Sequence, residues 1–269
     1  MNRDVVIIKS GGDIATGVIQ KLYRVGFRVL ALEAEKPTSI RRTVCFSEAI
    51  YEGKKTVEGI TAIHVKNIKE IYDAWEKDFV PVIVDPIGLY VEKIKPLAVV
   101  DAILAKKNTG LKREMASITI GIGPGFVAGK DCNVAIESNR GHNMGKLIFE
   151  GAAESNTGIP GNIAGYTSDR LLKSPDDGII TVKHDIGDFV KAGEVIAQVN
   201  NIDINAKIGG ILRGLIRDGT FVTKGFKVGD VDPRVEQLNN FFTISDKAMA
   251  IGGAVLEAIM IENRKNKSL

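Results

Sequence analysis

The sequence predicts an α/β protein in three parts: a parallel-sheet domain, a small β module and a helix that returns to the first domain. A strand, a glycine turn and a helix open the chain. Further along, a glycine-marked motif recurs with a 32-residue offset, and a helix with one apolar face follows it. We place the three parts at residues 1–170, 171–233 and 234–269.

The N-terminal segment has the pattern of a strand–helix–strand unit. Val5–Ile8 is a short β-branched strand, and Arg28–Leu32 is a second buried strand that ends at Glu33. The turn between them has small residues in the pattern S-x-G-x-x-A, a variant of the dinucleotide-binding fingerprint. This predicts a Rossmann-like sheet that binds a nucleotide, although the missing first glycine leaves open a scaffold that has lost its ligand. The site residues predicted here are Ser10, Gly11, Gly12, Asp13 and Glu33.

Other polar residues fall at the same predicted sheet edge. Arg41 and Arg42 lie in the loop after the second strand, where adjacent arginines can bind a phosphate or carboxylate bidentately. Solvated surface arginines are the alternative. Asp85 ends a buried strand, so we expect it either to meet a ligand hydroxyl or to cap the following turn.

The rest of the first domain continues to alternate strands and helices. Thr61–Val65 and Val80–Val84 have the pattern of strands, and Ile68–Lys77 has that of a helix. Pro96 suits the first turn of a further helix, which we expect over Leu97–Lys106. The alternation predicts a parallel sheet.

The stretch Ile118–Gly145 is the predicted centre of the site. It begins as a buried strand and breaks into Gly-Pro-Gly, where glycine adopts backbone angles that other residues avoid. The ionisable groups behind this loop suit an anionic or polar ligand, and a tight turn with a solvated hairpin is the alternative. The binding residues predicted here are Gly123, Gly125, Lys130, Arg140 and His142.

Cys132 is the one candidate catalytic residue. Its position beside Lys130 and His142 would lower the pKa of its thiol and let it accept a sulfur or selenium atom. A small core residue is the alternative.

An internal repeat defines the β module. Residues 175–199 can be laid on residues 207–231 without a gap, and the shared unit is G-x-F-V-x-x-G. Two such units would pair as interlocked halves of a small β-sandwich. The module resembles the barrel-sandwich fold of biotinyl and lipoyl carrier domains, but residues 199–205, at the carrier position, include no lysine. We therefore expect no carrier role.

Composition limits the class of protein. The chain has 269 residues, 44% of them apolar, and a net charge of +3, which is too mild to favour nucleic acid as a partner. It has two cysteines in no metal-ligand spacing, so we expect no metal site. No signal peptide or membrane span is apparent, and we expect a cytoplasmic protein.

Six short motifs carry a resemblance to a known family. The chain resembles the YqeB-like accessory proteins of the selenium-dependent molybdenum hydroxylase system, and is similar in part to XdhC-type proteins that handle molybdenum cofactor. The motifs are KSGGDIATG, RRTVCFSEAIYEG, VDPIGLYVEKIKPLAVVDAILAKKN, GPGFVAGKDCNVAIESNRGHNMG, NTGIPGNIAGYTSDR and AIGGAVLEAI.

The resemblance implies an accessory or maturation role for a molybdenum hydroxylase. The chain would bind molybdopterin dinucleotide at the edge of its Rossmann-like sheet, and the hydroxylase apoprotein would be its partner. An NAD(P)-dependent oxidoreductase and a non-catalytic scaffold that delivers the cofactor are the alternatives. Whether the chain is an enzyme, and whether it forms a homo-oligomer, is left open.

Overall fold

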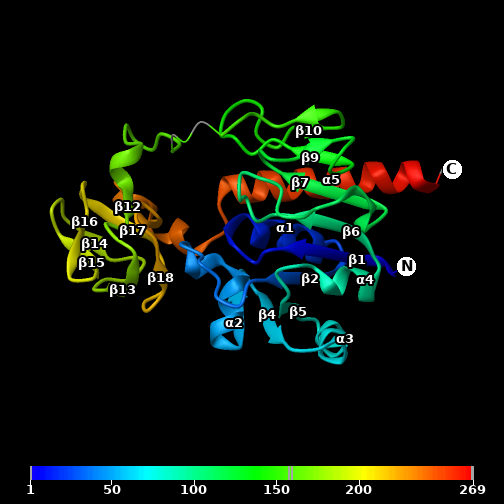
Figure 1. The fold of residues 1–269 in the computed structure, drawn as a ribbon, viewed down its shortest axis with the longest axis horizontal. Coiled ribbons are helices and arrows are strands. Elements are labelled where there is room, and N and C mark those ends of the chain that lie inside the picture. Colours follow the sequence, from blue (N-terminus) through cyan, green and yellow to red (C-terminus); the bar gives the residue numbers. More distant parts are fainter. Residues whose placement is uncertain (1, 157, 159, 268–269) are drawn as a thin grey trace. The chain divides into compact units, whose positions relative to one another are not determined.

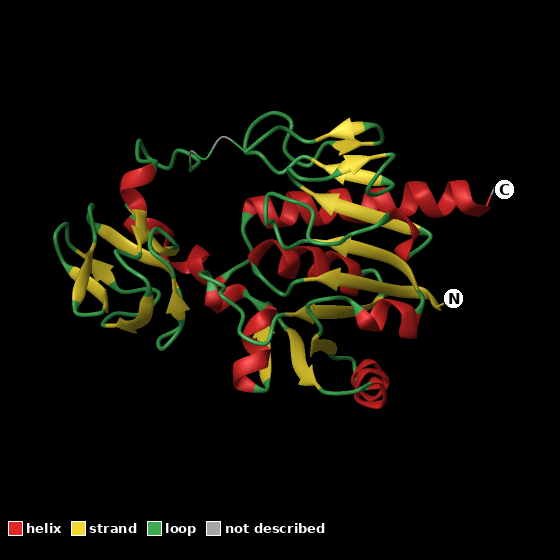
Figure 2. Cartoon of the chain, viewed as in Figure 1, coloured by secondary structure: helices red, strands yellow, loops and turns green. Residues whose placement is uncertain are grey.

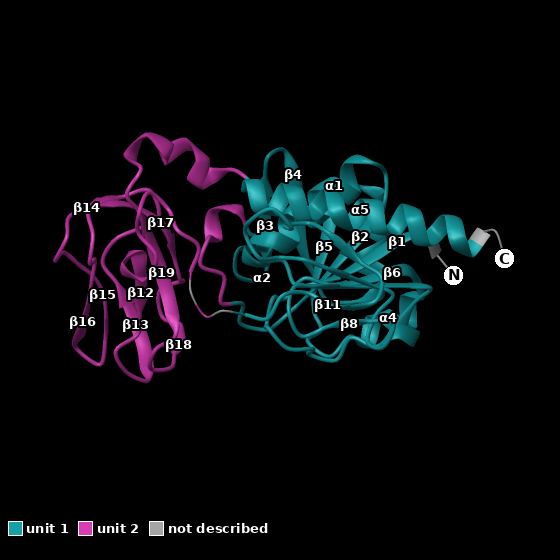
Figure 3. Cartoon of the chain, turned by 90° about the horizontal axis from the view of Figure 1, so that it is seen from above, with its two compact units in different colours: residues 1–37, 45–157, 244–269 teal, residues 38–44, 158–243 magenta. Residues whose placement is uncertain are grey.

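The chain folds into two compact units. The computed structural model describes residues 2–156, 158 and 160–267. Unit 1 comprises residues 1–37, 45–157 and 244–269, and unit 2 comprises residues 38–44 and 158–243 (Figures 1 and 3). The segment 38–44 therefore leaves unit 1 after the second strand and belongs to unit 2, which divides the chain differently from the boundaries expected from the sequence.

A nine-stranded sheet forms the body of unit 1, in the order β10-β9-β7-β6-β1-β2-β5-β4-β3. Its strands are β1 (Asn2–Lys9), β2 (Arg28–Glu33), β3 (Lys54–Val57), β4 (Ile60–Val65), β5 (Val80–Val84), β6 (Pro96–Asp101), β7 (Ile118–Ile122), β9 (Val134–Ile136) and β10 (Leu147–Ile148). The strands from β9 to β4 are parallel, and β10 and β3 run antiparallel at the two edges. β8 (Val127–Ala128) and β11 (Gly151–Ala152) make a separate two-stranded ribbon.

Helices cover both faces of this sheet. The helices of unit 1 are α1 (Asp13–Arg24), η2 (Phe46–Glu48), α2 (Ala49–Glu52), α3 (Ile68–Glu76), α4 (Leu89–Ile94), η3 (Arg113–Met115) and α5 (Asp246–Lys267). Val5 and Ile7 of β1 join a core that includes Ile71 of α3 and Ile94 of α4. Alternate strand residues point to the other face, where α1 and α5 lie side by side (Figure 3).

The predicted fold class is wrong for this unit. The sheet is mixed and not a parallel Rossmann-like sheet, because β3 returns along β4 as a hairpin and β10 returns along β9. The predicted helix Leu97–Lys106 is also wrong, since this run begins as strand β6, hydrogen-bonded on both sides. An apolar run such as Leu97–Val100 is compatible with a buried strand as well as with a helix. Pairing with β1 and β7 makes it a strand here.

Glycines allow α1 and α5 to pack at close range. A Cβ placed on Gly17 of α1 would lie 2.6 Å from the carbonyl oxygen of Ala248. A Cβ on Gly252 of α5 would lie 2.6 Å from the carbonyl oxygen of Gly17. The two backbones therefore touch, and any larger residue at either position would push the helices apart.

Unit 2 consists of two four-stranded antiparallel sheets, β12-β19-β17-β14 and β16-β15-β13-β18 (Figure 2). Its elements are η1 (Arg42–Val44), η4 (Ser168–Arg170), β12 (Leu171–Lys173), β13 (Gly178–Val182), β14 (Phe189–Val190), β15 (Val195–Val199), β16 (Ile202–Asn205), β17 (Gly210–Leu215), β18 (Phe221–Val222), β19 (Lys227–Asp232) and η5 (Val235–Phe242).

The internal repeat is visible in this pairing. β13, β14 and β15 begin 32 residues before β17, β18 and β19, respectively. β14 of the first half pairs with β17 of the second, and β18 of the second half pairs with β13 of the first. The prediction of interlocked halves is confirmed.

The predicted biotinyl- or lipoyl-like module over residues 171–233 is nevertheless a wrong description of unit 2. The unit takes in residues 38–44 from the N-terminal part of the chain, and η5 beyond residue 233. Thr43 Oγ1 donates to the carbonyl oxygen of Phe241 at 2.9 Å, and the N–H of Leu215 donates to the carbonyl oxygen of Ile40 at 2.9 Å. These contacts make segment 38–44 part of the unit's structure.

We predict opposite effects for alanine at two adjacent glycines of α5. Gly252→Ala should destabilise the protein by about 1–3 kcal/mol, because the new Cβ meets the backbone of α1. Gly253→Ala is the matched control: its Cβ would meet nothing within 4 Å, so it should stabilise the helix by up to about 1 kcal/mol. Urea unfolding followed by circular dichroism measures both, and equal shifts would contradict the close packing.

Candidate functional site

Buried carboxylates line the edge of the sheet where the parallel strands end. Each one stands at the end of a strand or directly after it, and each accepts hydrogen bonds from the loop that follows. Burying a carboxylate is costly unless donors surround it, and backbone N–H groups supply them here. These carboxylates belong to Glu33, Asp85, Asp101 and Glu137.

Glu33 ties the glycine turn to the end of β2. Its Oε1 accepts the N–H of Gly11 at 2.8 Å and the hydroxyl of Ser10 at 3.4 Å, and its Oε2 accepts the N–H of Ala34 at 2.6 Å. Burial raises the pKa of Glu33, and these hydrogen bonds lower it in part. Ser10 has a φ of 106° and its Oγ accepts the N–H of Gly12 at 3.0 Å. The turn is therefore closed by its own hydrogen bonds.

Asp85 and Asp101 close the neighbouring loops. Asp85 accepts the N–H groups of Gly88, Leu89 and Tyr90 at 2.8–3.0 Å, so it caps the turn before α4, the second of the two roles expected for it. Asp101 pairs with the buried Lys9, Nζ to Oδ2 at 3.1 Å, and accepts the N–H of Ile103 and the hydroxyl of Thr109, both at 3.2 Å.

The two arginines predicted to bind an anion are used inside unit 2. Arg41 is 6% exposed, and its Nη2 donates to the carbonyl oxygens of Asn240 and Thr243 at 3.3 and 3.1 Å. Arg42 donates from Nε to the carbonyl oxygen of Leu215 and from Nη2 to Asp185, each at 2.7 Å. Both side chains hold segment 38–44 in place and belong to a different unit from Glu33.

The glycines of the Gly-Pro-Gly loop serve close packing. Gly123 has a φ of +84°, and a Cβ there would lie 2.5 Å from Ser138 Oγ. Gly125 has a φ of +107°, and a Cβ there would lie 2.5 Å from the Cα of Lys107. The N–H of Gly123 donates to the carbonyl oxygen of Ile136 at 2.8 Å, so it is not presented to a ligand.

The ionisable residues behind this loop separate in space. Lys130 and His142 are exposed, whereas Cys132 is fully buried in the core of the sheet face that α3 and α4 cover. Burial raises the pKa of the Cys132 thiol to about 11, so a thiolate does not form at neutral pH. The small-core-residue interpretation of Cys132 fits this environment.

Arg140 faces the first turn of α5. Its guanidinium binds Asp246 bidentately, with N–O distances of 2.7 and 3.0 Å. Next to it, the half-buried Lys247 has a pKa lowered by burial and then by Arg140, and the carboxylates of Asp13 and Glu137 oppose that shift. Arg140 and Asp13, which the sequence analysis assigned to one site, thus both lie near Lys247 at the N-termini of α1 and α5.

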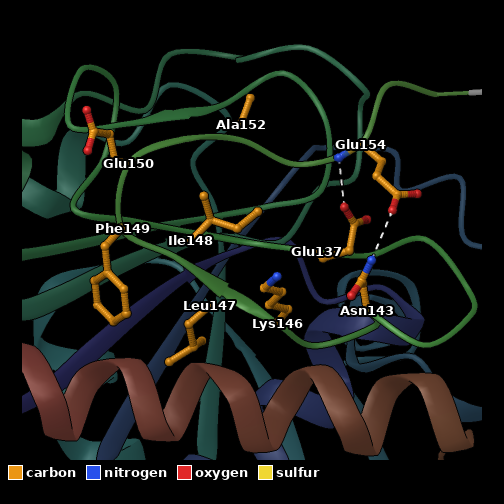
Figure 4. Close-up of a pocket in the computed structure, with 9 residues that line it drawn as sticks. All are labelled: Glu137, Asn143, Lys146, Leu147, Ile148, Phe149, Glu150, Ala152 and Glu154. Carbon is orange, nitrogen blue, oxygen red and sulfur yellow. Dashed lines mark hydrogen bonds between the residues drawn. The ribbon is translucent and has the colours of Figure 1, made fainter.

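A pocket of about 410 Å³ lies beside this cluster (Figure 4). It is formed by the β9–β10 connection, β10 and the segment that follows. The residues that line it are Glu137, Asn143, Lys146, Leu147, Ile148, Phe149, Glu150, Ala152 and Glu154. Glu137, Asn143 and Glu154 gather at one end, and Phe149 and Glu150 lie at the other.

Hydrogen bonds fix the acidic end of the pocket. Glu137 is 3% exposed and accepts the N–H of Asn139 at 2.6 Å and that of Glu154 at 2.7 Å. The Glu154 carboxylate accepts amide N–H groups from Asn139 at 2.8 Å and from Asn143 at 3.4 Å. The Asn139 amide, and then that of Asn143, lower the pKa of Glu154. The carboxylate therefore stays ionised below the usual range for glutamate.

The site residues predicted from the sequence end at His142, so the prediction missed most of this pocket. Lys146, Phe149 and Glu154 belong to a glycine-rich stretch without periodicity, so no repeat or motif marks them. The one usable signal was Glu137, which directly follows a buried strand, as the other strand-end carboxylates do.

Comparison with known proteins gives one close relative in sequence. No family model matches the chain. It is 50% identical over 257 residues to the uncharacterized protein YqeB of Escherichia coli K12, an alignment that covers 96% of this chain and 47% of the relative. The chain thus spans about half of the length of the curated relative it matches. The resemblance to YqeB is confirmed, and its name assigns no activity.

Solved structures match only weakly. An aspartoacylase family protein of Mesorhizobium loti is 15% identical, with 79% of this chain and 59% of that chain covered and a TM-score of 0.25. The ectoine utilization protein EutE of Ruegeria pomeroyi is 10% identical, with 86% of both chains covered and a TM-score of 0.26. A succinylglutamate desuccinylase of Silicibacter sp. TM1040 is 11% identical, covers 86% and 85%, and has a TM-score of 0.26. Scores this low carry no argument about activity.

The function predicted from the sequence is wrong. The sheet edge expected to hold the cofactor is closed by Glu33 and Asp85, and Arg41 and Arg42 are committed to unit 2. These four side chains are therefore engaged by the chain itself and do not form the predicted cofactor site. The NAD(P) oxidoreductase, which needs the same sheet edge, fails on the same grounds. The cofactor-delivering scaffold fails with the description of residues 171–233 as a barrel-sandwich module.

The structure tests the remaining expectations only in part or not at all. Among the described residues no helix is long and apolar enough to cross a membrane. Binding of molybdopterin dinucleotide or NAD(P), and a hydroxylase apoprotein as partner, stay predictions, and no step below depends on them.

We predict that both thiols are inert in the folded protein. Cys45 and Cys132 are fully buried, and the raised pKa of Cys132 leaves it protonated at neutral pH. A thiol-reactive chromogenic disulfide should therefore release two equivalents rapidly from the denatured chain and none on the same timescale from the native one. One fast equivalent from the native protein would contradict the burial of one of the two cysteines.

Proposed function

We propose that unit 1 is a ligand-binding unit whose pocket beside the β9–β10 connection takes a small organic amine in its ammonium form. The pocket volume, about 410 Å³, lies in the range typical of small-molecule sites. Charge, aromatic character and hydrogen bonding of its lining all favour this class of ligand.

The charge of the lining favours a cation. Three carboxylates, those of Glu137, Glu150 and Glu154, and one ammonium, that of Lys146, line the pocket. With these charges its formal charge is −2. A protonated amine donates up to three hydrogen bonds, and among the described residues each carboxylate oxygen at the acidic end accepts one N–H, where an ionised carboxylate oxygen can accept two.

The acidic end is prepared in advance for such a donor. Asn139 links two of the carboxylates, because its N–H binds Glu137 and its side-chain amide binds Glu154. The side chains are thus held in place before a ligand arrives, which reduces the entropy that binding must overcome. This preformed pair of carboxylates inside a pocket is the observation that carries the proposal.

The other lining residues suit the carbon part of an amine. Leu147 and Ile148 are half-buried and Phe149 is 42% exposed, so apolar surface remains open beside the acidic end. The ring of Phe149 already attracts a cation, since Lys265 Nζ lies 4.6 Å from its centroid. An amine with a short hydrocarbon body matches both features.

We predict that n-butylammonium binds and n-butanol does not, as measured by isothermal titration calorimetry. Glu154→Gln should weaken amine binding by about tenfold or more, because it removes one charged acceptor. Glu114→Gln, at an exposed glutamate of η3 outside the pocket, is the matched control and should leave binding unchanged. Equal affinities for the amine and the alcohol would refute the proposal.

The pH dependence gives a second prediction. Glu154 must be ionised to bind the ammonium group, and its lowered pKa keeps it ionised as the pH falls into the range where an ordinary glutamate is protonated. Asn139→Ala removes the larger cause of that lowering, so the pKa of Glu154 should rise. Amine binding should then be lost at a higher pH in the variant than in the wild type, and coincident pH profiles would contradict the role of Asn139.

A further inference from the structure

We propose that the ligand of this pocket is an α-amino acid with a cationic side chain, such as lysine or ornithine. This inference rests on the proposed function and adds two groups to the amine: a carboxylate and a second cation. Lys146 indicates the first of these, and Glu150 indicates the second.

The ammonium group of Lys146 favours a ligand that carries an anionic group. Its side chain is exposed and lines the pocket, and within residues 2–156, 158 and 160–267 its ammonium group has no hydrogen-bond or ion-pair partner. Figure 4 places it beside Glu137, at the acidic end. A simple amine bound to Glu137 and Glu154 would be repelled by this neighbouring ammonium. A carboxylate on the carbon next to the amine would instead bind Lys146.

The carboxylate of Glu150 favours a cationic group at the end of the pocket opposite Glu137. It lies at the opposite end of the pocket from Glu137 and Glu154, with Ile148 and Phe149 toward that side (Figure 4). The hydrocarbon stem of a lysine-like side chain can cover such apolar residues while its charged end reaches beyond them. The ammonium at that end would then face Glu150.

Charge matching separates this class from its competitors. The lining has three carboxylates and one ammonium. A basic amino acid has two cations and one carboxylate: the carboxylate meets Lys146, the side-chain ammonium meets Glu150, and the pair Glu137 and Glu154 shares the α-ammonium. An apolar amino acid leaves Glu150 unmatched, and a diamine leaves Lys146 unmatched.

The experiment compares three ligands on the full chain by isothermal titration calorimetry. L-Lysine has all three groups, norleucine lacks the side-chain ammonium, and cadaverine lacks the carboxylate. We expect lysine to bind more tightly than either of the others by about tenfold or more. Each of the other ligands lacks one charge-assisted hydrogen bond that lysine would make, and such bonds are stronger than neutral ones. Norleucine and cadaverine each differ from lysine by one charged group, so each comparison tests one contact.

Two variants assign the contacts to residues. Lys146→Met should abolish the advantage of lysine over cadaverine while cadaverine itself binds no more weakly. Glu150→Gln should abolish the advantage of lysine over norleucine. Lys112→Met and Glu114→Gln, at exposed positions outside the pocket, are the matched controls and should keep both advantages.

The outcomes separate this inference from the proposed function. If cadaverine binds as tightly as lysine, or norleucine does, the inference is overturned while amine binding stands. If lysine, cadaverine and n-butylammonium all fail to bind, both the inference and the proposed function are overturned. If the lysine advantage survives in Lys146→Met, the assignment of the carboxylate to Lys146 is wrong.

Discussion

Backbone N–H groups bound by buried carboxylates organise the edge of unit 1 at which the parallel strands end. Parallel strands end together at one edge, and the loops that follow carry N–H groups without a sheet partner. Glu33, Asp85, Asp101 and Glu137 accept these groups, and the burial of each carboxylate is tolerable because of them. Each loop is therefore held to its strand by a charge-assisted contact, and the edge is rigid and closed.

Because these loops are closed, the pocket does not lie at the ends of β2 and β5, where a nucleotide site was expected. At the turn at Gly11 and the turn before α4, the chain's own carboxylates accept the N–H groups of Gly11 and Gly88. Glu137 differs in one respect: one of the N–H groups that it accepts comes from Glu154, 17 residues further along the chain. That contact draws the segment after β10 back over the hairpin and forms the wall of the pocket.

The same residue types have different roles according to where the chain takes them. Arg41 and Arg42 have the pattern of an anion site, but segment 38–44 crosses into unit 2, where backbone carbonyl oxygens receive their donors. Cys132 has basic neighbours in sequence, but the turn between β8 and β9 places it in the core while Lys130 faces solvent. Leu97–Val100 follows a proline suited to a helix start, but its backbone hydrogen-bonds to the two neighbouring strands, β1 and β7, and so forms a strand.

The sequence by itself determined the local features: the first strand–turn–helix, the strand Val80–Val84, and the repeat whose halves interlock, because short-range periodicity and glycine placement encode them. Only the tertiary structure decided the direction of the edge strands, the path of segment 38–44 and the position of the pocket. Each of these depends on contacts between residues far apart in the chain, such as Glu137 with the N–H of Glu154, and no local pattern specifies them.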